Sequence, residues 1–113
     1  MLDNIPSKCN LAQTEIFGPI VAVYRFSEEK EAIEKANNTN MGLAGYLYTN
    51  DISRIERLQR SLKVGVLGLN NALPSVAYAP MGGMKHSGLG REGARHGLEE
   101  YQEVKYVAQE FDL

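Results

Sequence analysis

Short apolar runs alternate with amphipathic segments along the first two thirds of the chain. The runs at 20–26, 43–49 and 64–69 are rich in aliphatic, β-branched and aromatic residues, and Gly, Pro or Asn residues precede or follow them. Such runs are typical of buried strands. Between them, Ser27 precedes acidic residues and an apolar stripe, which predicts a helix ending near 37–38 with Ser27 as its N-cap.

A second helix is predicted after Asn50-Asp51. Its apolar residues recur at helical spacing and form one core-facing stripe: Ile52, Ile55, Leu58 and Leu62. Strands separated by helices of this length predict right-handed βαβαβ crossovers and a parallel sheet covered on both faces, so the fold class is α/β. In such sheets ligands bind beyond the carboxyl ends of the strands, where 70–75 leads into a glycine-rich loop.

The C-terminal part has a different pattern. A helix interrupted by Gly93 and Gly97 is predicted over 92–102, followed by a short strand over 104–108. Two interpretations of this last strand stay open. It completes the chain's own sheet, or it pairs with another chain as an oligomerisation strand, because a terminal strand with a free edge can accept a partner.

Composition narrows the class of protein. The 113 residues allow one domain at most, and a net charge of −2 with both signs interspersed argues against nucleic-acid binding. Arg54, Arg57 and Arg60 fit a solvated helix face. No apolar run is long enough to span a bilayer, and no signal peptide is visible.

Cysteine and histidine usage adds two expectations. One cysteine, Cys9, excludes an internal disulfide framework and fits a reducing cytoplasm. It lies without a partner histidine or a glycine turn, so we interpret it as incidental rather than nucleophilic. His86 and His96 are not accompanied by further ligands at metal-binding spacing, so no metal site is expected.

The glycine-rich loop, residues 79–93, is the most unusual segment. Its five glycines predict a chain that passes very close to a ligand or another polypeptide segment. Within it, residues 88–93 match G-x-G-x-x-G. That fingerprint binds a dinucleotide only when a strand enters the first glycine and a helix leaves the third, and 82–87 do not form a strand. A pyrophosphate loop is therefore disfavoured.

Taken together, several ordered blocks resemble the aldehyde dehydrogenase superfamily. They are Glu15-Ile16-Phe17-Gly18-Pro19, Asn40-Met41-Gly42-Leu43-Ala44-Gly45, Gly65-Val66-Leu67-Gly68-Leu69-Asn70, Pro80-Met81-Gly82-Gly83-Met84-Lys85-His86-Ser87-Gly88-Leu89-Gly90-Arg91-Glu92 and the ending from Gly97 to Val107. The resemblance covers practically the whole chain, but only the C-terminal part of the family. It implies a single partial domain over 1–113, with an α/β catalytic-domain part at 14–90 and a C-terminal helix and pairing strand at 91–113.

The resemblance implies oxidation of an aldehyde by a cysteine thiolate, with hydride transfer to NAD or NADP and thioester hydrolysis by a glutamate-activated water. Both catalytic groups of the family lie upstream of the Glu15 block, so this chain carries no catalytic residue and is expected to be inactive alone. Glu15 matches the family glutamate that binds the nicotinamide ribose. Phe17 matches the aromatic beside the nicotinamide. A solvated loop acid and a core aromatic are the alternative interpretations.

On the substrate side, the resemblance is strongest to succinate-semialdehyde dehydrogenases. Met81 occupies the position of a tunnel-lining phenylalanine, and Ser75 that of a serine that helps hold the substrate's distal carboxylate, although an ordinary loop serine is an equal alternative. Arg91 and Glu92 are more simply interpreted as anchors of the helix after the loop, and Lys85 as a donor to carbonyls of the loop.

Three hypotheses about function follow. The chain is a piece of an NAD(P)-dependent aldehyde dehydrogenase, a non-enzymatic interaction module derived from one that forms homo-oligomers through its last strand, or a self-sufficient nucleotide-binding domain using Gly88 to Gly93.

Overall fold

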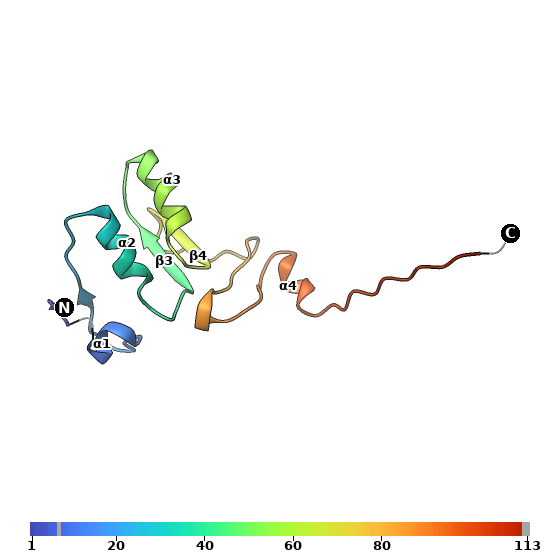
Figure 1. The fold of residues 1–113 in the computed structure, drawn as a ribbon, viewed down its shortest axis with the longest axis horizontal. Helices are drawn as coiled ribbons and strands as arrows, with labels where there is room; N and C mark the ends of the chain where they lie inside the picture. The colour runs from blue at the N-terminus through green and yellow to red at the C-terminus, as the bar shows by residue number, and fades with distance from the viewer. Residues whose placement is uncertain (7, 112–113) are drawn as a thin grey trace.

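The computed structural model describes residues 1–6 and 8–111 (Figure 1). The elements in chain order are β1 (Leu2–Asp3), α1 (Asn10–Gln13), β2 (Ala22–Val23), α2 (Glu29–Asn37), β3 (Ala44–Leu47), α3 (Ile52–Ser61), β4 (Val66–Leu69), the 3-10 helix η1 (Lys85–Ser87) and α4 (His96–Glu99). The alternation of strands and helices predicted for 20–69 is confirmed. β1 and α1 were not predicted, because neither is long enough to show a periodic pattern.

The strands form two separate parallel pairs. β1 pairs with β2, with Leu2 opposite Ala22, and β3 pairs with β4, from Ala44 opposite Val66 to Leu47 opposite Leu69. The predicted parallel pairing is confirmed. The prediction of one continuous sheet through all three apolar runs is wrong within the described residues. The run at 20–26 forms only a two-residue strand, because its ladder extends no further than the short β1.

The N-cap of α3 was predicted correctly, whereas the N-cap of α2 was not. Asp51 caps α3 as expected, since its Oδ1 accepts a hydrogen bond from the Arg54 amide at 3.0 Å. The N-cap of α2 is Glu28, not Ser27, and no side-chain cap bond is formed there. Instead, the Ser27 amide donates to Glu31 Oε2 at 3.1 Å. The N-cap position therefore lies one residue later than predicted.

The described chain encloses almost no core. Leu58 is its one buried apolar side chain, at 7% exposure, whereas Ile52 at the start of the predicted stripe is 76% exposed. The radius of gyration is 19.5 Å, while a compact domain of this size has about 13 Å. The apolar faces of the helices and strands therefore lack most of the surface that they would need to pack against.

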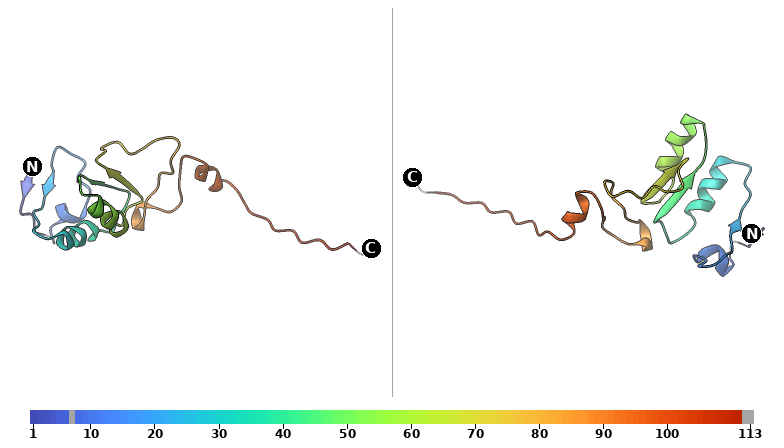
Figure 2. Two further views of the ribbon diagram at one scale, coloured as in Figure 1. Left: turned by 90° about the horizontal axis from the view of Figure 1, so that it is seen from above. Right: turned by 180° about the vertical axis from the view of Figure 1, so that it is seen from behind.

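The C-terminal part departs most from expectation. α4 has only four residues, and the described chain beyond it runs away from the rest as an extended segment (Figures 1 and 2). The predicted strand at 104–108 pairs with no strand in the part of the chain that the structure describes, and Val104 is 98% exposed. The interpretation in which it completes the chain's own sheet is therefore wrong, since it makes no ladder there. Residues 112 and 113 of the predicted 91–113 unit lie outside the described residues.

Candidate functional site

The carboxyl ends of β3 and β4 are fixed together by one asparagine. Asn70, directly after β4, accepts from the Thr49 amide and donates to the Thr49 carbonyl, both at 2.9 Å. This reciprocal pair ties the two strand ends together where the chain turns towards the glycine-rich loop. Asn70 itself has a φ of 51°, a left-handed conformation that asparagine tolerates better than most residues.

The glycine-rich loop passes very close to the start of β4. A Cβ atom on Gly65 would overlap the carbonyl group of Gly82, so the two backbones lie too close together for a side chain at position 65. The predicted close approach is thus confirmed, and the neighbour is another segment of the same chain. The 3-10 helix η1 precedes Gly88, and α4 begins only at His96. The loop consequently lacks the strand and helix that a dinucleotide fingerprint requires.

Three polar side chains hold the loop in place. Ser87 Oγ accepts from the Gly42 amide at 2.8 Å, while Lys85 Nζ donates to the carbonyls of Asn37 and Thr39 at 3.0 and 2.8 Å. The Arg91 guanidinium donates from Nη1 to the carbonyls of Gly83 and Gly90 at 3.0 and 2.6 Å. Lys85 and Arg91 therefore both have structural roles, but Lys85 bonds carbonyls outside the loop and Arg91 bonds carbonyls of the loop, the reverse of what was predicted. Lys85 additionally satisfies carbonyls at the C-terminal end of α2.

Met81 lies in the groove that this loop encloses. Its backbone forms an antiparallel bridge with Glu92, with amide-to-carbonyl distances of 2.8 and 2.7 Å. Its half-buried side chain lines an open groove of about 480 Å³ together with Leu89, Arg91 and Tyr101. Glu100 closes one side, since its Oε1 accepts from the Arg91 amide at 3.2 Å. A flexible thioether in such a position can adapt to ligands of different shapes.

The other predicted site residues lie elsewhere on the surface. Glu15 and Phe17 are exposed in the segment between α1 and β2, and the Phe17 ring is 93% exposed. Ser75 is exposed in the segment between β4 and η1. None of the three lines the Met81 groove. The described residues alone therefore do not assemble the cofactor and substrate residues into one site.

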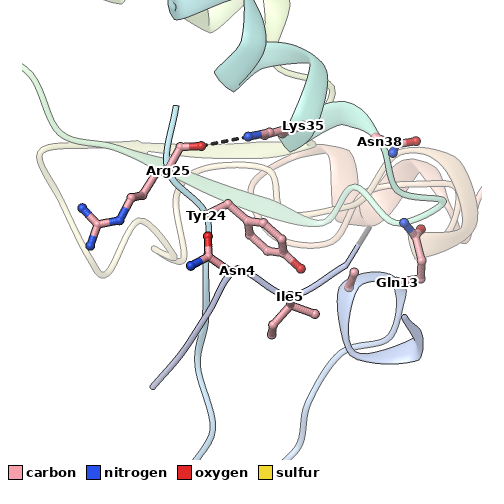
Figure 3. A pocket seen from close by; sticks show the side chains of 8 residues that line it. Asn4, Ile5, Gln13, Tyr24, Arg25, Lys35 and Asn38 are labelled. Carbon is pink, nitrogen blue, oxygen red and sulfur yellow. Dashed lines mark hydrogen bonds between the residues drawn. The ribbon is translucent and has the colours of Figure 1, made fainter. Parts of the chain in front are cut away.

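A second hollow, which the sequence pattern did not reveal, lies between the N-terminal segment and α2 (Figure 3). It has a volume of about 370 Å³, and the Tyr24 ring, Asn4 and Gln13 lie around it. The Lys35 ammonium is held at its edge by the Arg25 carbonyl at 2.8 Å and by Glu31 Oε1 at 2.6 Å. The pKa of Glu31 is lowered, chiefly by this lysine. Lys35 thus joins the segment that follows β2 to α2.

The helices α2 and α3 are joined by charged groups. Glu29 of α2 accepts from Arg54 Nε at 3.0 Å and from two nitrogens of Arg57 at 2.9 Å. These hydrogen bonds lower the pKa of Glu29 from 4.5 to about 2, and the bonds from Arg57 have the largest effect. Arg54 and Arg57 are exposed on the helix face, as expected, and in addition they bind Glu29 of the neighbouring helix. Arg60 contacts Glu56 of the same helix at 3.4 Å.

Two features are absent from the described residues. No cluster of three or more histidine, cysteine, aspartate or glutamate side chains there could hold a metal ion. Within 1–6 and 8–111, none of the helices has the length and apolar character needed to cross a membrane. Cys9 is a half-buried free thiol at the N-cap position of α1.

Comparison with known proteins identifies the family. The model of the aldehyde dehydrogenase family matches residues 1–107. The chain is 49% identical over 97 residues to a succinate semialdehyde dehydrogenase of Acinetobacter baylyi, covering 86% of the chain and 20% of that protein. Over 107 residues it is 46% identical to a 3-sulfolactaldehyde dehydrogenase of Pseudomonas putida and 42% identical to the NADP(+) succinate-semialdehyde dehydrogenase GabD of Escherichia coli K12, covering 95% of the chain and 22% of each.

Solved structures give the same result. An NADP-dependent enzyme of E. coli superposes with a TM-score of 0.89 at 42% identity, covering 93% of this chain and 22% of its own. An indole-3-acetaldehyde dehydrogenase of P. syringae in complex with NAD+ gives a TM-score of 0.86 at 37% identity, covering 91% of this chain and 21% of its own. The chain thus spans about a fifth of the length of these relatives.

Proposed function

Because the chain belongs to the aldehyde dehydrogenase family, we propose that it is the C-terminal part of an NAD(P)-dependent aldehyde dehydrogenase that oxidises succinate semialdehyde to the corresponding acid. We refer to the longer polypeptide as the parent enzyme. The observation that carries the proposal is the 42–49% identity to relatives named as semialdehyde or sulfolactaldehyde dehydrogenases over most of the chain. Placement at the C-terminal end stays a prediction, because these identities give only the share of each relative that is matched.

The names of these relatives suggest a common type of substrate. Succinate semialdehyde and 3-sulfolactaldehyde both carry an anionic group, carboxylate or sulfonate, away from the aldehyde. A hydroxyl can donate to such an anion, and the exposed Ser75 is available to do so. In this proposal Met81 supplies an apolar wall that the aliphatic part of the substrate contacts.

The residues proposed for the cofactor fit a nicotinamide nucleotide in two respects. The Glu15 carboxylate is exposed and can accept hydrogen bonds from ribose hydroxyls, and the exposed Phe17 ring offers a face for the nicotinamide. The cofactor would accept the hydride removed from the substrate. NAD and NADP stay alternatives, because the strand that distinguishes them in the family is proposed to lie outside residues 1–113.

The test is the activity of the parent enzyme. We expect reduction of NAD or NADP with succinate semialdehyde and a kcat/KM at least ~10-fold lower for butanal, which lacks the carboxylate. Chain 1–113 alone is expected to give no reduction, because the catalytic cysteine and glutamate are proposed to lie outside it. A parent enzyme that reduces neither cofactor with any aldehyde would refute the proposal.

Two matched variants of the parent enzyme test the site residues. Ser75→Ala should raise KM for succinate semialdehyde up to ~10-fold, the effect of losing one hydrogen bond, and leave KM for butanal unchanged. Glu15→Gln should raise KM for the cofactor, while Glu28→Gln, another exposed acid, should not. Equal effects of Ser75→Ala on both aldehydes would remove Ser75 from the site.

The second candidate function, a non-enzymatic oligomerisation module, is favoured by one observation. The extended segment after α4 leaves Val104 and Tyr106 at 98% and 88% exposure, which suits addition of a strand to the sheet of a second copy. Light scattering after size-exclusion chromatography should then detect dimers or larger oligomers, and deletion of 104–111 should abolish them. A monomer at high concentration would contradict this candidate.

A further inference from the structure

Asn37 connects the C-terminal ends of the two longer helices. It is the last residue of α2, and Ser61 is the last residue of α3. Asn37 Nδ2 donates to the Ser61 carbonyl at 2.8 Å, and Asn37 Oδ1 accepts from the Lys63 amide at 2.9 Å. Because the last four carbonyls of a helix have no partner within it, this side chain satisfies one of those of α3. One half-buried asparagine thereby fixes the end of α3 and the start of the turn towards β4.

The same end of α2 is bonded to the glycine-rich loop. Lys85 Nζ donates to the carbonyl of Asn37 at 3.0 Å and to that of Thr39 at 2.8 Å. Three more bonds join the residues that follow Asn37 to residues 84–87: the His86 amide donates to the Asn40 carbonyl at 3.0 Å, the Met84 amide to the Gly42 carbonyl at 2.9 Å, and the Gly42 amide to Ser87 Oγ at 2.8 Å. We call these five hydrogen bonds between 37–42 and 84–87 the loop clasp.

The backbone of Lys85 has an unfavourable conformation within the loop clasp. Its φ is 58°, in the left-handed region that residues other than glycine, asparagine and aspartate rarely adopt. Such a conformation persists only where the surrounding contacts impose it, and conformations of this kind cluster at active sites and ligand clamps. The two bonds from Lys85 Nζ are contacts of this kind. The conformation of the loop at Lys85 therefore depends on the position of Asn37 and Thr39.

Met81 lies between the loop clasp and a second fixed part of the loop. Its backbone forms the antiparallel bridge described above, and the Arg91 guanidinium donates to the Gly83 carbonyl at 3.0 Å. Gly83 is buried, and Gly82 lies too close to Gly65 for a side chain at position 65. The two residues between Met81 and Met84 therefore have little freedom of movement. A shift of the loop clasp consequently moves Met81 and the groove that it lines.

We propose that Asn37 is a positioning residue of the proposed site and acts on Met81 through the loop clasp. Its side chain fixes the end of α2 against α3, its carbonyl binds Lys85, and Lys85 holds the loop that carries Met81. Asn37 is not among the described residues that line the Met81 groove, so it affects the substrate through other residues and not by contact. The inference rests on the proposed function in one respect, namely that Met81 contacts the aldehyde substrate.

Hydrogen exchange of the parent enzyme tests the link between Asn37 and the loop. Asn37→Asp keeps an acceptor oxygen and loses the donor to the Ser61 carbonyl. The amides of Met84 and His86 should then exchange about 2- to 10-fold faster, the effect of losing one hydrogen bond. Asn38→Asp is the matched control, because it places the same charge on the adjacent, exposed residue, and it should leave these amides unchanged. Unchanged exchange in Asn37→Asp, or an equal effect of Asn38→Asp, would overturn the inference.

Steady-state kinetics test the effect on the substrate. Asn37→Asp should raise KM for succinate semialdehyde about 2- to 10-fold, change kcat by less than ~2-fold and leave KM for the cofactor unchanged. KM for butanal should rise as well, because Met81 is proposed to contact the aliphatic part of either aldehyde. A purely structural role of Asn37 would lower the fraction of active enzyme, and hence the apparent kcat, without changing KM. That result would remove Asn37 as a positioning residue.

Two variants of Lys85 test the same link from the side of the loop. Lys85→Met removes both bonds from Nζ and should reproduce the changes in exchange and KM that Asn37→Asp causes. Lys85→Arg keeps a charged donor and should restore KM to within ~2-fold of the unsubstituted enzyme. Because both residues act through one network, the double variant of Asn37→Asp and Lys85→Met should change KM by less than the product of the two single effects. A KM change equal to that product would show that the two residues act independently and would overturn the inference.

The outcomes separate this inference from the proposed function. A parent enzyme that reduces neither cofactor loses the proposed function, and amide exchange then still decides whether Asn37 positions the loop. An active enzyme whose Met84 and His86 amides do not respond to Asn37→Asp keeps the proposed function and loses the inference.

Discussion

Glu29 and Arg57 form a two-pronged ion pair that joins α2 to α3. Arg57 Nε lies 2.9 Å from Glu29 Oε1, and Arg57 Nη2 lies 2.9 Å from Glu29 Oε2. Arg54 donates to the same carboxylate at 3.0 Å. Single surface ion pairs contribute little to stability, but one carboxylate shared by two arginines in fixed geometry is a stronger contact. Because Leu58 is the one buried apolar side chain among the described residues, this polar contact is one of the defined links between the two helices.

The first prediction concerns the pH dependence of this contact. The pKa of Glu29 is lowered from 4.5 to about 2, so its stabilising contribution is fully present above pH 4.5 and is lost as the pH falls through about 2. NMR titration of the Glu29 carboxyl group should give an apparent pKa near 2. Arg57→Met should shift it back towards 4.5. Glu31, whose pKa is lowered chiefly by Lys35 of the same helix, is the comparison and should not respond to Arg57→Met.

The second prediction concerns the close approach of Gly65 and Gly82. Gly65→Ala should destabilise the protein by about 1–3 kcal/mol, because its Cβ would overlap the Gly82 carbonyl. Thermal unfolding of the parent enzyme measures this effect. Gly18→Ala is the matched control, since a Cβ at Gly18 would meet no atom within 4 Å. Equal effects of the two substitutions would show that the backbones are not in contact at Gly65.

The third prediction concerns Arg91 as an anchor of the glycine-rich loop. Arg91→Met removes the hydrogen bonds to the carbonyls of Gly83 and Gly90. Bonds from a charged donor contribute about 1.5–3 kcal/mol, which corresponds to a roughly 10- to 100-fold change in local opening. The amides of Met81 and Glu92, which bridge the loop, should therefore exchange faster by that factor. Arg95→Met, which removes an exposed arginine, is the control and should leave the exchange rates of the Met81 and Glu92 amides unchanged.

The fourth prediction distinguishes the two helix caps. Asp51→Ala should lower stability by about 0.5–2 kcal/mol, because it removes the acceptor for the Arg54 amide. Ser27→Ala should change it by less than about 0.5 kcal/mol, since the Ser27 side chain does not cap α2. Denaturant unfolding of both variants provides the measurement. A larger loss for Ser27→Ala would contradict the position of the α2 N-cap.

Part of the candidate site could be predicted from local sequence. The glycine spacing indicated a close backbone approach, and the contact between Gly65 and Gly82 confirms it. Structural roles were predicted for Lys85 and Arg91, but with other partners: Lys85 bonds carbonyls of Asn37 and Thr39 outside the loop, and Arg91 bonds carbonyls of the loop itself. The roles of Glu15, Phe17, Ser75 and Met81 stay predictions. Their side chains are not brought together by the described residues.

The sequence by itself determined the alternation of strands and helices over 20–69, the parallel pairing and the cap at Asp51, because these depend on periodicity, chain connectivity and hydrogen bonds between near neighbours. Only the tertiary structure decided which strands pair, that Glu29 binds Arg54 and Arg57, and that the segment after α4 lies unpaired in the described chain. Those features depend on which surfaces meet in space. The separation of the two strand pairs within the described residues has the same physical cause, since backbone pairing requires two strands to lie side by side.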